Sequence, residues 1–150
     1  MKIRTALVAA LALVAAVAVT GCGHLMMMHG GNVARPAESE FGTGPRASAS
    51  RRFTATLQPD QPLRPRRMQT VRVAITDAAG APVDNATIQI DGGMPQHGHG
   101  LPTRPRVTRA LGNGLYEIEG VRFNMGGWWE FTLAINAASA SDVVTFNLAL

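Results

Sequence analysis

Two histidines separated by a single residue are the side chains of this sequence best placed to do chemistry. His97 and His99 lie in the stretch from Gly92 to Pro105, in which seven of fourteen residues are glycine or proline. This composition predicts a long connection that is either functional or mobile. Side chains at positions i and i+2 of an extended segment project to the same side, so the two imidazoles can share one ion. Met94 adds a thioether three residues before His97.

Met125 is expected to join these side chains because of a predicted hairpin. The strand that leaves the histidine segment runs away from it, turns at Gly112-Asn113-Gly114, and is followed by a strand that comes back. The Asn-Gly step favours the positive φ angles of such a tight turn. The predicted donor set is therefore two imidazoles and two thioethers: Met94, His97, His99 and Met125.

Copper is the metal that this donor chemistry indicates. Thioether sulfur selects Cu(I) and imidazole accommodates Cu(II), whereas hard cations prefer oxygen ligands. Zinc would prefer a third imidazole or a carboxylate, for which only Asp91 is nearby. Two alternatives stay open. Met125 continues the alternation of Val121 and Phe123, which is typical of a methionine at the edge of a core. The two histidines can be polar loop residues that bind no metal.

The start of the chain has the features of a bacterial secretion signal. A basic cluster is followed by an apolar run from Ala6 to Val19, which is too short to span a bilayer comfortably. Val19-Thr20-Gly21-Cys22 resembles the bacterial lipobox, whose cysteine is joined to diacylglycerol. We therefore predict a lipoprotein anchored at Cys22 that faces the periplasm, with the lipid bilayer as its partner. Gly23, next to Cys22, gives no cue for retention in the inner membrane, which favours the outer membrane. The alternative to a lipoprotein signal is an ordinary secretion signal that contains a cysteine.

Residues 1–21 are thus assigned to the signal peptide, and residues 22–50 to a flexible tether rich in Gly, Ala, Ser and Pro. Methionine and histidine gather at the start of this tether, where a disordered tract can bind copper loosely. A spacer of accidental composition is the alternative. The accessory candidates are His24, Met26, Met27, Met28 and His29.

Residues 51–150 show short alternating runs separated by turn residues. This pattern predicts an all-β, immunoglobulin-like sandwich of about seven antiparallel strands and no helix after the signal. Gly120 falls at a phase slip in the strand from Leu115 to Asn124, which indicates a bulge. The strand faces predicted to be buried carry Phe53, Ala55, Leu57, Val71, Val73, Ile75, Ile88, Ile90, Tyr116, Ile118, Val121, Phe123, Trp129, Phe131, Leu133, Ile135, Val144, Phe146, Leu148 and Leu150.

The composition narrows the classes of function. A chain of 150 residues has room for one domain and a tail, not for a multidomain enzyme. A single cysteine excludes an internal disulfide, zinc patterns built on paired cysteines and, once acylated, a blue-copper centre. No Gly-x-Ser-x-Gly motif is present, and Glu117 and Glu119 are expected on a solvent-facing strand surface, so the protein is not expected to be an enzyme.

Arginine is concentrated in one part of the chain. Seven arginines fall within residues 46–72, opposed there only by Asp60. They could attract anionic headgroups beside the anchor, and a solvated linker with one arginine-rich strand face is the alternative. Nucleic acid is not an expected partner, because the signal removes the chain from the cytoplasm and no platform of aromatic and basic residues is present.

The segment from residue 68 to 150 resembles the YtkA-like family, which is related loosely to FixH-type periplasmic domains. The resemblance is carried by Met94-Pro95-Gln96-His97-Gly98-His99-Gly100, by Gly114-Leu115-Tyr116, and by the run from Gly120 to Trp129. It implies a small extracytoplasmic β-sandwich, lipid-anchored or secreted, in copper-handling or respiratory-oxidase contexts. Many relatives carry Met-Pro-Gly where this chain has Met125-Gly126-Gly127.

Two functions are compatible with these features. The first is a monomeric cell-envelope lipoprotein that binds or delivers copper by ligand exchange, with a protein partner in copper handling or oxidase assembly. The alternative is a metal-free interaction module that docks on an envelope membrane complex through the same loops. Copper titration of the folded domain distinguishes the two functions. The first function predicts that the domain binds copper and that replacement of both loop histidines abolishes this binding.

Overall fold

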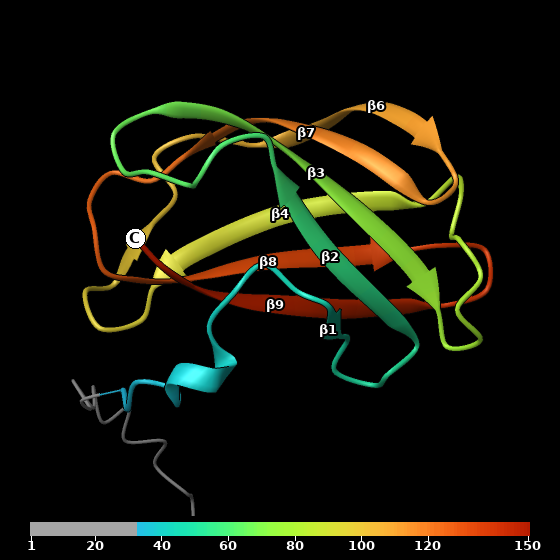
Figure 1. Cartoon of the computed structure of the whole chain (residues 1–150), viewed down its shortest axis with the longest axis horizontal. Coiled ribbons are helices and arrows are strands. Elements are labelled where there is room, and N and C mark those ends of the chain that lie inside the picture. The colour runs from blue at the N-terminus through green and yellow to red at the C-terminus, as the bar shows by residue number, and fades with distance from the viewer. Residues whose placement is uncertain (1–32) are drawn as a thin grey trace, which may run out of the picture. The chain divides into compact units, whose positions relative to one another are not determined.

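The computed structural model describes residues 33–150, which form two antiparallel β-sheets packed face to face (Figure 1). The first sheet has the strand order β1-β2-β3-β7-β6 and the second has the order β5-β4-β8-β9. The predicted all-β sandwich is therefore confirmed. The elements of the described residues are a short 3-10 helix η1 (Glu38–Glu40) and the strands β1 (Arg46–Ala47), β2 (Phe53–Pro59), β3 (Met68–Asp77), β4 (Thr87–Met94), β5 (His99–Gly100), β6 (Arg106–Gly112), β7 (Leu115–Arg122), β8 (Trp128–Asn136) and β9 (Ser141–Ala149).

The core lies between the sheets and consists of alternate side chains from both. Strand geometry points successive residues to opposite faces, and β2, β3, β8 and β9 alternate accordingly between buried and more exposed positions. Of the residues predicted to face the core, all are buried except Ile90 and Leu150, which are partly buried against it. Hydrophobic periodicity thus sets the orientation of each long strand.

The predicted hairpin and bulge are both present. Asn113 adopts a φ of 53° in the turn between β6 and β7, and a Cβ on Gly114 would lie 2.3 Å from the Ile75 carbonyl oxygen, so only glycine fits there. The pairing of β3 with β7 moves from Val71↔Ile118 to Gln69↔Val121, which places one extra residue in β7. This bulge reverses the alternation and lets both halves of β7 face the core.

The stretch from Gly92 to Pro105, predicted to be one long connection, is partly strand. β4 continues to Met94, and β5 pairs back onto it. The glycines reflect close packing of backbones within the sheet: a Cβ on Gly92 would lie 2.7 Å from the Glu130 carbonyl oxygen, and one on Gly93 would lie 2.9 Å from that of His99. Glycine within a strand can mark such close approach of a second backbone.

The sandwich also includes residues upstream of the predicted boundary at residue 51. β1 pairs with β2, Phe41 bridges to Asn147, and Ser48 is buried. The ordered domain therefore reaches further toward the N-terminus than expected. The predicted signal peptide, Cys22 and the Met/His tract at residues 24–29 lie outside the described residues. Within residues 33–150, no helix is long and apolar enough to cross a membrane.

Antiparallel pairing gathers four connections and the C-terminus at one end of the sandwich. The connections are those from β2 to β3, from β4 to β5, from β5 to β6 and from β7 to β8, and Leu150 lies beside Gly127 through paired backbone hydrogen bonds. This end, at the left of Figure 1, carries the two histidines and is called the histidine end below. Residues 33–150 form a compact unit with a continuous core.

Candidate metal site on the β4–β5 hairpin

The two histidines sit on a tight hairpin between β4 and β5. The backbone N–H groups of His97 and Gly98 both donate to the Met94 carbonyl oxygen, at 3.0 and 2.9 Å. Gly98 has a φ of 63°, which closes the four-residue turn, and Met94 then pairs with His99 across the ladder. The local hydrogen bonds therefore fix the backbone on both sides of His97.

The imidazole rings lie near each other on the surface. Both histidines are exposed, their ring centroids are 6.3 Å apart, and the ring planes are inclined by 20°. A metal ion about 2 Å from one nitrogen of each ring would lie about 3 Å from each centroid, so such a pair of centroids can be up to about 6 Å apart. The centroid separation is thus close to this limit, and the stacked rings must turn before a nitrogen of each can point at one ion.

Met94 occupies a different environment. Its side chain is 1% exposed, and a Cβ added to Gly127 would lie 2.8 Å from the Met94 methyl carbon. The thioether is thus packed in the core beneath the connection from β7 to β8, while the imidazoles lie outside. In this arrangement Met94 anchors the hairpin to the body of the sandwich.

Met125 lies at the histidine end, on the connection from β7 to β8. Its side chain is half-buried against the core, and its carbonyl oxygen accepts a hydrogen bond of 3.1 Å from the Trp129 indole. The structure therefore brings the segments that carry all four predicted donors to one end, and it separates the donors by depth. His97 and His99 are at the surface, Met125 is intermediate, and Met94 is inside.

Glu130 is a neighbour of the hairpin that the sequence reasoning missed. An open pocket of about 320 Å³ lies between His99 and Glu130, because β8 pairs directly with β4. The alternation of β8 indicates that Glu130 faces outward, but no sequence pattern shows which strand lies beside β4. Within residues 33–150, no group of three or more His, Cys, Asp or Glu side chains is arranged to hold a metal ion.

The expectation that Glu117 faces solvent beside Glu119 is wrong. Glu117 is only 6% exposed, and Arg109 is its cross-strand partner. The Arg109 guanidinium donates to both carboxylate oxygens, from Nε at 2.7 Å and from a terminal nitrogen at 2.8 Å. The buried Glu117 carboxylate therefore has a structural role, which is to pair with Arg109 across the two strands.

Known proteins similar to this chain include a solved structure and a protein family. A solved structure described as "ZirS C-terminal Domain" is similar, with 14% sequence identity and a TM-score of 0.39 over 99% of this chain and 95% of that one. No curated protein matches the sequence. The family model described as "YtkA-like" matches residues 47–134, which is more than half of the chain and includes the β4–β5 hairpin. The chain therefore belongs to the YtkA-like family.

Proposed function

We propose that this protein is a cell-envelope lipoprotein that binds copper at the β4–β5 hairpin and passes it to a partner by ligand exchange. The observation that carries the proposal is the pair of exposed imidazoles, 6.3 Å apart, on a turn held by backbone hydrogen bonds. Neither histidine side chain takes part in a hydrogen bond within the described residues, which leaves both rings able to coordinate.

The donor types set the expected oxidation states. Two imidazoles suit Cu(II), and a thioether adds affinity for Cu(I). Met125 is the thioether that supports this site, since it lies at the same end and is half-buried. Met94 acts as a positioning residue, because its buried side chain fastens the hairpin to the core. An exposed site with few protein ligands favours transfer, since incoming ligands can reach the ion.

The proposed location rests on the sequence at the N-terminus. An apolar run followed by Val19-Thr20-Gly21-Cys22 supports acylation of Cys22 and attachment to the periplasmic side of a membrane, with the outer membrane favoured. The tract from His24 to His29 would then lie directly beside the anchor, where it can collect copper loosely. Mass spectrometry of the membrane-extracted chain tests the anchor: diacylglyceryl on Cys22 supports it, and an unmodified cysteine contradicts it.

Copper binding is tested by titrating the fragment of residues 33–150 with Cu(I) and with Cu(II) against competing chelators. We expect binding tighter than about micromolar, which corresponds to about 8 kcal/mol. The variant His97→Ala/His99→Ala should lose it. Binding weaker than micromolar, or binding indifferent to the double substitution, would favour the metal-free interaction module.

A matched pair of variants tests the role of Met125. Met125→Leu should weaken Cu(I) binding more than Cu(II) binding, because leucine keeps the apolar volume and removes the sulfur. Met68→Leu is the control, since Met68 is exposed and lies at the same end of the sandwich. Equal effects of the two substitutions would remove Met125 from the site.

A further inference from the structure

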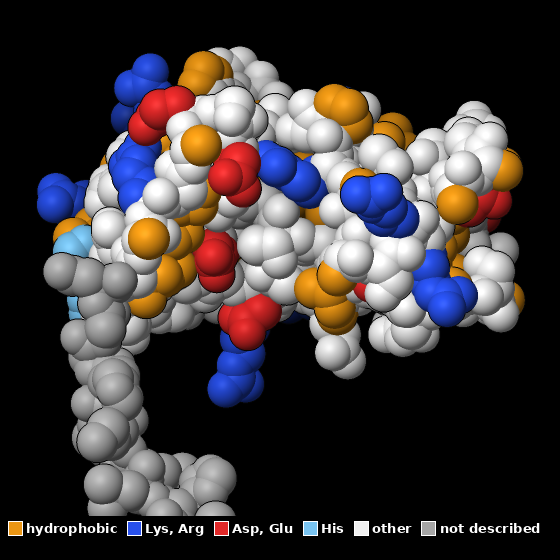
Figure 2. Space-filling view, turned by 90° about the horizontal axis from the view of Figure 1, so that it is seen from below, with side chains coloured by type: hydrophobic (Ala, Val, Ile, Leu, Met, Phe, Trp, Pro, Cys, Tyr) orange, Lys and Arg blue, Asp and Glu red, His pale blue; other side chains and the backbone are white. Residues whose placement is uncertain are grey.

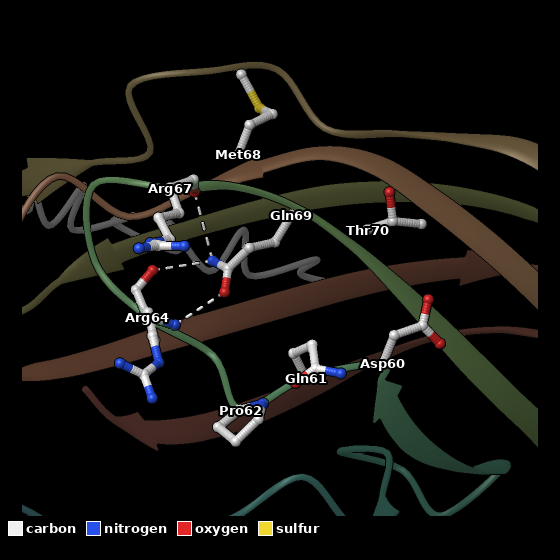
Figure 3. A pocket seen from close by; sticks show the side chains of 8 residues that line it. All are labelled: Asp60, Gln61, Pro62, Arg64, Arg67, Met68, Gln69 and Thr70. Atoms are coloured by element: carbon white, nitrogen blue, oxygen red, sulfur yellow. Dashed lines mark hydrogen bonds between the residues drawn. The ribbon is translucent and has the colours of Figure 1, made fainter.

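The connection from β2 to β3 presents arginines on a fixed backbone at the histidine end. The Gln69 side chain accepts the Arg64 N–H at 2.8 Å and donates to the Arg64 carbonyl oxygen at 3.0 Å (Figure 3). On the other side, the Arg66 N–H donates to the Phe123 carbonyl oxygen at 2.7 Å. The loop is therefore tied both to β3 and to the connection that carries Met125.

The positive charge of this loop is not neutralised within the described residues. Arg64, Arg66 and Arg67 are exposed and take part in none of the ion pairs there, whereas Arg72 pairs with Asp60 at 2.7 Å. Figure 3 shows Arg64 and Arg67 on the same side of an open pocket of about 430 Å³, with Asp60 at the opposite side. The loop thus offers guanidinium groups to an anion.

Further arginines lie at the same end. Figure 2 shows basic side chains beside the histidines at the left of the view. Three exposed arginines lie there: Arg104 on the connection from β5 to β6, Arg106 at the start of β6 and Arg122 at the end of β7. Met68, next to Arg67, is 63% exposed and adds an apolar side chain at this surface. A mixed surface of arginine and apolar groups suits the headgroup region of a bilayer.

The described chain also begins at the histidine end. The Gln96 side-chain amide donates to the Val33 carbonyl oxygen at 3.4 Å, so Val33 lies beside the turn that carries His97. Eleven residues lead from Cys22 to Val33, and at no more than about 3.6 Å each they reach about 40 Å. A lipid on Cys22 would therefore hold Val33, and with it the histidine end, within about 40 Å of the membrane.

We propose that the histidine end docks on anionic phospholipid headgroups through Arg64, Arg66 and Arg67. The orientation rests on the proposed anchor at Cys22, and the lipid contact rests on charge complementarity between guanidinium groups and phosphates. The proposed copper hairpin then faces the bilayer, which is where a membrane-embedded acceptor would take the ion. A guanidinium group pairs with a phosphate in a bidentate manner. This geometry favours a specific contact by arginine side chains over a general attraction between net charges.

Co-sedimentation of the fragment of residues 33–150 with vesicles tests this proposal without the anchor. Vesicles of phosphatidylcholine with about one-third phosphatidylglycerol should bind the fragment, and pure phosphatidylcholine vesicles should not. The variant Arg64→Gln/Arg67→Gln should bind the anionic vesicles about 25-fold more weakly, at about fivefold per arginine. The matched control Arg51→Gln/Arg52→Gln removes the same charge from the exposed β1–β2 turn at the opposite end, and it should change binding by less than about threefold.

Three results would overturn the proposal. The first is no binding to the anionic vesicles, and the second is an equal loss of vesicle binding in the two double variants. The third is release of the fragment from the vesicles when inorganic phosphate is added at constant ionic strength. The last result would indicate a site for soluble phosphate. Neither a metal nor the lipid anchor on Cys22 enters the assay, so its outcome is separate from the copper titration and from the mass of Cys22.

Discussion

His97 and His99 lie at the surface of the β4–β5 turn, whereas the Met94 side chain is packed in the core. The i, i+2 spacing predicts that the two imidazoles share a side, and the structure places their centroids 6.3 Å apart. Met94 was expected to be a ligand because glycines made its segment resemble a loop. Gly92 and Gly93 belong to β4, whose alternation turns Met94 inward.

The ion pair of Arg109 with Glu117 is expected to stabilise the fold more than the pair of Arg72 with Asp60. Glu117 has only 8% of its side chain exposed, so Arg109→Ala leaves a buried carboxylate without a partner. We expect the free energy of unfolding to fall by about 1–3 kcal/mol in denaturant titrations.

The control substitution is Arg72→Ala, whose partner Asp60 has 54% of its side chain exposed. That change should cost no more than about 1 kcal/mol, because water replaces the lost guanidinium. A second variant, Arg109→Ala/Glu117→Leu, should recover part of the loss by removing the buried charge. Equal losses from Arg109→Ala and Arg72→Ala would show that the burial of Glu117 is unimportant.

At the scale of elements, a carboxylate joins the start of the domain to its last strand. Asp142, at the start of β9, accepts hydrogen bonds from the Ser48 hydroxyl at 2.6 Å and from the Ser50 N–H at 2.9 Å. The Ser48 hydrogen bond and those from backbone N–H groups lower the pKa of Asp142 from 3.8 to about 2. These bonds favour the ionised form and fasten the β1–β2 turn to the second sheet.

This pKa predicts loss of stability in acid. A carboxyl with a lowered folded-state pKa contributes stability that is fully present above pH 3.8 and is lost as the pH falls toward 2. Thermal unfolding of the wild type and of Asp142→Asn should therefore give a higher Tm for the wild type at pH 6 and a much smaller gap near pH 2. A gap that stays constant over this range would contradict the assigned role of the carboxylate.

The long elements could be predicted from the sequence, and the short ones could not. Alternation identifies β2, β3, β8 and β9, and Asn113 with Gly120 identifies the hairpin and the bulge. β1 and β5 have two residues each, which is too short for any period to be visible. Both are defined by their neighbours, β2 and β4, through backbone pairing.

At the scale of the whole molecule, antiparallel pairing collects the histidines, Met125 and an arginine-rich loop at one end. The return of Met125 to this end follows from the hairpin and was predictable. The order of strands in each sheet was not, because it depends on contacts between segments far apart in the sequence. That order is what places Glu130 beside His99 and Arg66 beside Phe123.

The boundary of the domain gives a prediction at this scale. The fragment of residues 51–150 lacks Ser48, β1 and the backbone bond from the Leu57 N–H to the Thr43 carbonyl oxygen, at 2.6 Å. Its free energy of unfolding should be lower than that of residues 33–150 by about 2–4 kcal/mol. The fragment of residues 41–150 keeps these contacts and should match the longer one; equal stability of all three would show that the upstream segment contributes nothing.

Electron paramagnetic resonance of Cu(II) bound to residues 33–150 shows whether His97 and His99 hold the same ion. We expect a single ion per chain with nitrogen couplings from two imidazoles. Each single alanine variant should keep one coupling, and the double variant should lose both. Two ions per chain with one imidazole each, or a spectrum unchanged in the double variant, would contradict the shared site.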